Sequence, residues 1–251
     1  MEKISTKLEL KRITGLFNHP DLKKFLWVIF AFMMTPSLTS TYNFYYTVEL
    51  KFDLSTMSSI GFVSAVGYFL SIIALNSLLK EVELKPLFVV SGIFITILNF
   101  SSLFLLWKFV TAMSISTVMY CYIINASLVF VNELNFLPLM SLCCRLCPRD
   151  LEGTTYGLFT SIFNFGNYLA SILASLLLLV FGVTSHDYSH LWLVVIIQAV
   201  YGASVLLVLT TFNFPLPDKI SGDDQSIFLG DFEENEVIAP KRRARNDIAE
   251  D

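Results

Sequence analysis

Six long apolar segments, separated by short polar stretches, make up most of this chain. They lie near residues 25–47, 57–79, 86–107, 111–143, 155–180 and 190–214. A bilayer core about 30 Å thick is crossed by roughly 20 mostly apolar residues in a helix, and each segment reaches that length. The pattern therefore predicts an all-α polytopic membrane protein, with a transmembrane domain of six helices over residues 25–214.

Composition and charge support this prediction. Hydrophobic residues make up 55% of the 251 residues and the mean hydropathy is +0.65, which is too apolar for an ordinary soluble domain. Of the 17 Lys and Arg residues, only Lys51 and Lys108 fall on one side of the six-helix arrangement. Basic residues near span ends favour the cytoplasmic side. The sequence therefore predicts cytoplasmic termini, in a plasma membrane or an organelle envelope.

The two ends of the chain differ from the apolar domain. Residues 1–24 form a basic cytoplasmic lead-in, in which Ile4, Leu8 and Leu16 stand among lysines. This segment could lie on the anionic membrane surface as a short helix, or it could be a solvated lead-in. Residues 215–251 are polar and mixed in charge, which is typical of a disordered cytoplasmic tail.

Small and hydroxyl-bearing residues mark two of the predicted spans. The first span contains Pro36 close to Ser37, Thr39 and Ser40, which predicts a kink with hydroxyls available to the freed backbone. The fifth span has small and weakly polar residues at spacings of three and four, which lets helices pack closely or line a cavity. These are Gly157, Ser161, Asn164, Tyr168, Ser171 and Ser175.

Polar residues inside a span are costly and need a packing or functional explanation. Glu133 lies 12 residues before Arg145, which is roughly 18 Å along a helix and therefore near the middle of the membrane. Asn164 reaches a similar depth on the next span, and Asn135 and Asn167 flank the two. We interpret these four residues as a candidate substrate or proton-coupling site. The alternative is that they form interhelical hydrogen bonds with a structural role.

Other kinds of chemistry find little support in the sequence. Cys144 and Cys147 form a C-x-x-C pair without a second pair or a nearby His, so no metal site is expected. His186 and His190 stand four apart in a connection, which is a weak signal. No pair of His or Asp residues lies within the spans, and all three histidines fall outside them. We therefore expect neither an enzyme nor a cofactor, and no nucleic acid as a partner.

One set of positions spans the connection between the fourth and fifth predicted spans: Leu137, Pro138, Arg145, Leu146, Cys147, Pro148, Glu152, Gly153, Thr154, Ser161 and Asn164. In order and spacing they resemble the signature of the folate–biopterin transporter family, a branch of the major facilitator superfamily. The similarity covers roughly residues 25–214. Members of this family have about twelve spans in two halves, and the resemblance matches only the second half.

The resemblance implies transport of folates or pterins, with possible proton coupling as one half of a secondary transporter. Glu133 would then titrate a proton or orient the substrate, and Arg145 would pair with Glu152 as a cytoplasmic gate or latch. A six-span half could pair with a copy of itself or with an N-terminal half. It could also be part of a truncated or degenerate transporter, or a non-transporting membrane subunit that acts through protein interaction.

Overall fold

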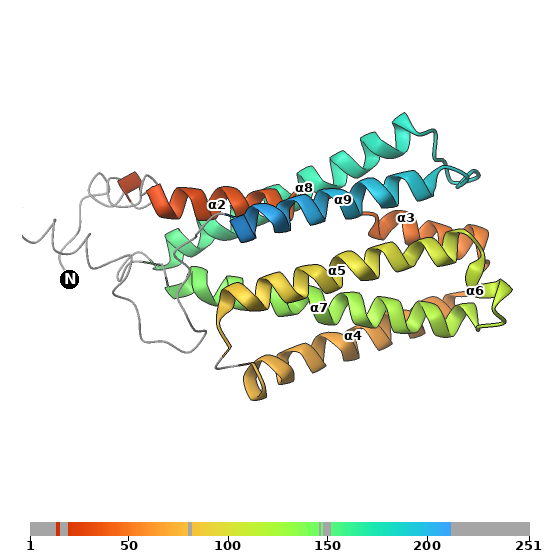
Figure 1. Cartoon of the computed structure of the whole chain (residues 1–251), viewed down its shortest axis with the longest axis horizontal. Helices are drawn as coiled ribbons and strands as arrows, with labels where there is room; N and C mark the ends of the chain where they lie inside the picture. Colours follow the sequence, from red (N-terminus) through yellow and green to blue (C-terminus); the bar gives the residue numbers. More distant parts are fainter. Residues whose placement is uncertain (1–13, 16–19, 80–81, 146, 148–151, 212–251) are drawn as a thin grey trace, which may run out of the picture.

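The computed structural model is a bundle of apolar helices that lie side by side along one long axis (Figure 1). It describes residues 14–15, 20–79, 82–145, 147 and 152–211. The helices in this part of the chain are α2 (Pro20–Met33), α3 (Thr39–Phe44), the π-helix η1 (Tyr45–Glu49), α4 (Leu54–Ser77), α5 (Leu84–Leu106), α6 (Phe109–Ala112), α7 (Thr117–Arg145), α8 (Glu152–Val180) and α9 (Leu191–Thr211).

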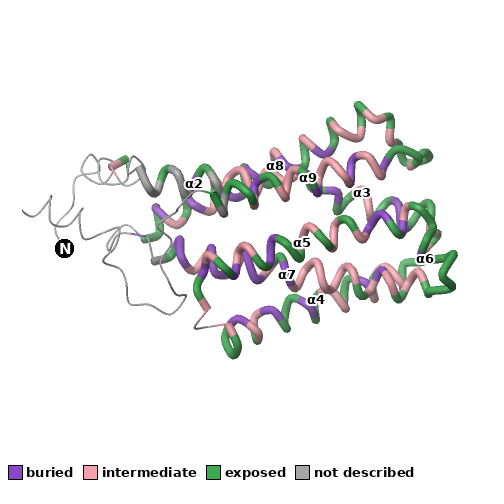
Figure 2. Tube along the Cα trace, in the orientation of Figure 1, coloured by how far each residue is buried: buried purple, intermediate pink, exposed green. Residues whose placement is uncertain are grey.

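The all-α polytopic fold predicted from the sequence is confirmed. Five helices, α4, α5, α7, α8 and α9, are long and apolar enough to cross a membrane. Large apolar side chains remain exposed along them, among them Phe62, Phe94 and Ile123, and exposed positions run along the outside of the bundle (Figure 2). Such a surface is suited to lipid, because lipid tails are as apolar as these side chains.

The first predicted span, residues 25–47, is built from two helical pieces. The helix α2 ends at Met33, and α3 begins at Thr39 after the break at residues 34–38. The two pieces lie toward opposite ends of the bundle (Figure 1), so together they run along its length. Pro36 explains the break, because its ring clashes with a continuing helix and it has no N–H. The predicted kink is therefore a full interruption of the helix.

Protein atoms cover this break. The Ser37 N–H donates to the Ala170 carbonyl of α8 over 3.3 Å, and the Thr35 hydroxyl donates to the Phe32 carbonyl over 2.7 Å. Gly166 allows α8 to approach closely, since a Cβ added there would lie 2.8 Å from the Met33 Cβ. Irregular backbone at membrane depth is tolerated only where protein or a cavity surrounds it. The packing of α8 on the break meets this condition.

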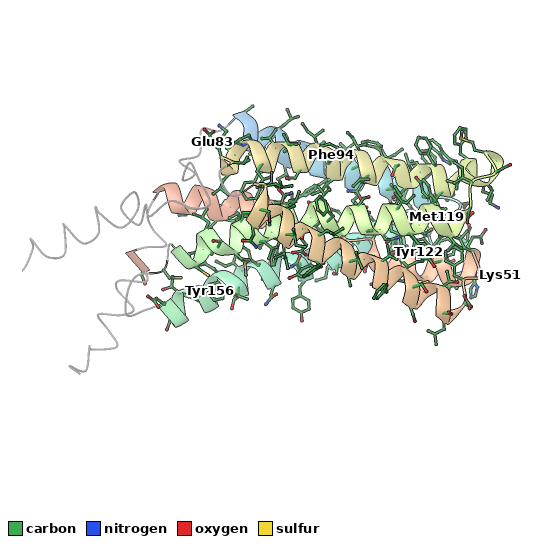
Figure 3. The ribbon with its side chains drawn as sticks, turned by 90° about the horizontal axis from the view of Figure 1, so that it is seen from below. Lys51, Glu83, Phe94, Met119, Tyr122 and Tyr156 are labelled. Carbon is green, nitrogen blue, oxygen red and sulfur yellow. The ribbon has the colours of Figure 1, made fainter. Side chains whose placement is uncertain are left out.

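The connections alternate between the two ends of the bundle. Figure 3 shows Lys51 at one end, and Glu83 and Tyr156 at the other. Lys108 lies at the Lys51 end, because its Nζ is 3.8 Å from Glu49. This agrees with the sequence, which puts Lys51 and Lys108 on the same side. Most of the lead-in and the whole tail lie outside the described residues.

The two largest apolar clusters of the described residues occupy the two ends of the bundle, beside a smaller one around Leu75, Leu87 and Leu134. The cluster at the Glu83 end is built around Leu26, Leu84, Leu142 and Phe159. The cluster at the Lys51 end contains Leu38, Tyr45, Leu103, Cys121 and Leu191 among others. Each cluster joins helices that are distant in sequence, so each end is packed by its own core. The middle of the bundle lies between them.

We predict that Gly166→Ala destabilises the protein by about 1–3 kcal/mol, the usual range for overpacking a close contact. The added methyl group would push α8 away from Met33 and weaken the hydrogen bond from Ser37 to Ala170. Gly153→Ala, on the same helix, is the matched control, because nothing lies within 4 Å of its added Cβ. Thermal unfolding in detergent compares the two variants, and equal melting temperatures would contradict the predicted close packing.

Candidate functional site

A cavity of about 380 Å³ lies in the middle of the bundle. Its walls come from α2, the break after α2, α3, α5, α7, α8 and α9. Ile29 and Leu139, which border it on one side, belong to the cluster at the Glu83 end. Tyr42, on its other side, packs against the cluster at the Lys51 end. The cavity therefore lies where the two apolar cores leave room between them.

Carboxamide side chains dominate the polar part of the cavity wall. Six asparagines and one glutamine line it: Asn43, Asn99, Asn125, Asn132, Asn135, Asn167 and Gln198. Hydroxyl groups of Thr35, Ser37, Thr39, Tyr42 and Thr96 add to them. None of the described lining residues is Asp, Glu, Lys, Arg or His. The wall is thus polar and uncharged, with apolar and aromatic side chains between the amides.

The amides on α7 are held by hydrogen bonds within the bundle. The Asn125 Nδ2 donates to the Cys121 carbonyl over 2.8 Å and to the Tyr46 hydroxyl over 3.1 Å. The Asn132 Nδ2 donates to the Leu128 carbonyl over 2.8 Å. Asn135 is buried and accepts a hydrogen bond from the Ser91 hydroxyl of α5. These bonds fix the direction in which the amides face.

The break in the first span forms one wall of the cavity. Thr35, Pro36 and Ser37 line it directly. Just before the break, the Ala31 carbonyl accepts a hydrogen bond from the Tyr201 hydroxyl of α9 over 3.1 Å. Discontinuous helices with exposed backbone groups are a common element of substrate and ion sites in secondary transporters. The break therefore brings backbone polar groups next to the amide side chains.

The structure brings together only part of the predicted site. Asn135 and Asn167 both line the cavity. Glu133 does not line it, although it is near the same depth on α7. Helical spacing puts it on the same face of α7 as Ala126, Phe130 and Leu137. This face packs on α4, where Gly67 contacts Ala126. One Glu133 carboxylate oxygen, Oε2, is buried and has no hydrogen-bond partner among the described residues.

Asn164 also lies away from the cavity, on the exposed face of α8. The small and weakly polar residues that share its helical stripe are exposed as well, from Gly157 to Ser175. Arg145 ends α7 and Glu152 begins α8 at the same end of the bundle. The Arg145 side chain lies outside the described part of the structure, so the predicted gate or latch between these residues stays a prediction.

The cysteines and histidines are spread over both ends of the bundle. Cys143 and Cys147 are buried in the core at the Glu83 end, where the Cys147 thiol bonds the Cys143 carbonyl over 3.2 Å. His186 and His190 are exposed at the Lys51 end. Between them, the Ser189 backbone N–H donates to the Asp187 carboxylate over 2.9 Å and lowers its pKa. No group of three metal-ligating side chains occurs among the described residues.

Three of the seven cavity amides follow a regular spacing in the sequence of α7. Asn125, Asn132 and Leu139 recur every seven residues, and Leu128 and Asn135 fall between them, which puts all five on one side of α7. Asn99 and Gln198 were also visible as amides inside apolar spans. What the sequence could not give is that these residues from different helices face the same space.

The fold and the cavity define a class of protein, a polytopic helical membrane protein with a polar cavity inside the bundle. Residues 5–227 match the model of the BT1 family, and the chain therefore belongs to the BT1 family. The resemblance to folate–biopterin transporters is thus confirmed.

Curated relatives carry names that agree with this family. The chain is 30% identical to "Folate transporter 1" of Plasmodium falciparum, over 78% of this chain and 39% of the relative. It is 27% identical to "Probable folate-biopterin transporter 4" of Arabidopsis thaliana, over 80% and 40%, and 26% identical to "Folate-biopterin transporter" of a Synechocystis strain, over 78% and 40%. The chain therefore spans about two fifths of these relatives. No solved structure matches it.

We predict that a cysteine at Thr96 reacts quickly with a small charged thiol reagent, and that a cysteine at Phe94 reacts slowly. Thr96 lines the cavity, whereas Phe94, two residues away at the same depth on α5, points outward (Figure 3). Thiols react as thiolates, which need water or another polar environment. Both variants are made in a Cys144→Ser background, because Cys144 is the exposed cysteine. Equal rates would contradict a water-accessible cavity.

Proposed function

We propose that this chain is a six-helix half of a secondary transporter that moves folate-like or pterin-like solutes across a membrane. The observation that carries the proposal is the uncharged, amide-lined cavity beside a broken helix, in a chain of the BT1 family. Transporters hold their substrates near the midplane, at discontinuous helices. In this proposal the substrate occupies the cavity and contacts Asn135 and Asn167.

A second six-helix half completes the transporter in this proposal. It is either another copy of this chain or an N-terminal half, because the named relatives are more than twice as long as the matched region. The exposed stripe on α8, which includes Asn164, faces that second half. Small residues at this position allow helices from two halves to approach closely, and alternating access arises as one half rocks against the other.

Glu133 is the proton-coupling residue in this proposal. Glu133 shares a face of α7 with Ala126, which packs on Gly67 of α4, and it does not line the cavity. Its Oε2 is buried and has no hydrogen-bond partner among the described residues. A buried carboxylate oxygen without a partner is costly unless the group is protonated. A change in its protonation would therefore alter how α4 packs on α7, the wall that carries Asn132 and Asn135. Coupling would act through this packing, without direct contact with the substrate.

The proposal also includes the orientation of the bundle in the membrane. Both termini lie in the cytoplasm, so the Glu83 end of the bundle faces the cytoplasm and the Lys51 end faces the other side. Most basic residues of the chain fall on the cytoplasmic side in this orientation. Arg145 and Glu152 latch the short connection between α7 and α8 there. Glu152 also stands in the first turn of α8, where a carboxylate is favoured by the helix dipole.

We predict that Glu133→Gln abolishes the pH dependence of folic acid uptake while the protein still reaches the membrane. The amide keeps the size of the side chain but cannot release a proton. Uptake by proteoliposomes is measured at several internal and external pH values. Asp53→Asn is the matched control, since Asp53 is an exposed carboxylate that caps α4 through the Thr56 N–H. Unchanged pH dependence in Glu133→Gln would rule out this role.

A further inference from the structure

One residue of the cavity wall, Gln198, carries a buried hydrogen-bond acceptor without a partner among the described residues. The Gln198 Oε1 is buried and has no hydrogen-bond partner among the described residues, and Gln198 lines the cavity from α9. Buried polar groups are almost always paired in folded proteins. A ligand in the cavity that turns this side chain toward itself would give the oxygen the donor that it lacks.

Asn125 presents a second acceptor to the cavity. Its amide nitrogen faces the Cys121 carbonyl, which can only accept, and it also donates to the Tyr46 hydroxyl. A carboxamide nitrogen carries two N–H donors, so both are used within the protein. The carbonyl oxygen is the part of Asn125 that remains for a ligand. Asn132 lies seven residues further along α7, and one of its amide N–H groups donates to the Leu128 carbonyl. Its second N–H group and its carbonyl oxygen remain for a ligand.

The charge of the cavity restricts what can bind there. No Lys, Arg or His occurs among its described lining residues. The basic side chains that the structure describes, Lys23, Lys51, Lys85 and Lys108, lie near helix ends. A carboxylate buried without a cation is strongly disfavoured. A ligand group suited to this cavity is therefore uncharged.

The volume of the cavity and its aromatic lining residues favour a flat ring. Phe32, Tyr42 and Phe88 border the cavity and supply aromatic faces for offset stacking. Asn and Gln side chains match the donor and acceptor edge of planar heterocycles, as they do with adenine. The volume of about 380 Å³ lies within the usual range of small-molecule sites, roughly 300–1,000 Å³.

We infer that this cavity binds an uncharged planar heterocycle with N–H donors on its edge, the pteridine ring of folates and biopterins, and leaves the carboxylate tail outside. The inference rests on the proposed function and assigns the part of the substrate that this chain recognises. Gln198 and Asn125 accept the ring N–H groups. The glutamate tail of a folate then depends on groups beyond the cavity.

Ligand competition on the purified 251-residue chain in lipid nanodiscs tests this inference. Radiolabelled folic acid is displaced by pterin, which has the ring alone, or by p-aminobenzoyl-glutamate, which has the tail alone. We expect pterin to displace folic acid and the tail compound to have no effect at the same concentration. Displacement by the tail compound, or none by pterin, would overturn the inference while leaving folate binding intact. If folic acid itself fails to bind, the proposed function fails as well.

A variant of Gln198 tests whether this side chain accepts a hydrogen bond from the ligand. Gln198→Met keeps a similar length without the oxygen, and we expect about a tenfold loss of affinity for folic acid and for pterin, equivalent to one hydrogen bond. Its melting temperature should not fall, because the lost oxygen had no partner within the described protein. Asn76→Leu is the matched control, an amide on α4 that bonds Ile72 and lies outside the cavity. Unchanged affinity in Gln198→Met would overturn the assignment.

Discussion

Inside a bilayer, each backbone N–H and C=O group needs a partner within the protein, because lipid tails offer none. The helix of the first span is interrupted at residues 34–38, yet polar groups of the interruption still find partners within the protein. The Ser37 N–H donates to the Ala170 carbonyl of α8, and the Thr35 hydroxyl donates to the Phe32 carbonyl. The close approach of α8, which Gly166 permits, is what allows the break. The break in turn opens the side of the bundle where the cavity lies, so helix packing and the site depend on the same contact.

The position of the cavity follows from the two cores. Apolar clusters fill both ends of the bundle, and the amides occupy the region between them. Asparagine and glutamine are suited to such a place, because they hydrogen-bond strongly without carrying a charge that would need a partner. In a chain of the BT1 family, this arrangement supports the proposed recognition of a neutral ring, and it leaves the proposed proton-coupling residue Glu133 on a separate helix face.

The sequence predicts the depth of a residue in the membrane more reliably than the direction in which it faces. Glu133 and Asn135 are near the same depth on α7, but successive residues turn by about 100° around a helix. Asn135 therefore lines the cavity, while Glu133 lies on the face of α7 that carries Ala126, which packs on Gly67 of α4. Pro36 predicted a kink, but the hydrogen bond that covers the break comes from Ala170, which lies more than a hundred residues away. Contacts of this kind between distant segments are not visible in local patterns.

The most direct test of this account is an experimentally determined structure of the chain with folic acid bound. The account predicts that the pteridine ring lies in the cavity between α2, α5, α7 and α9, within hydrogen-bonding distance of Gln198 and Asn125. A ring bound instead on the exposed face of α8, beside Asn164, would contradict it, because the substrate site would then lie between two halves and outside the six-helix bundle.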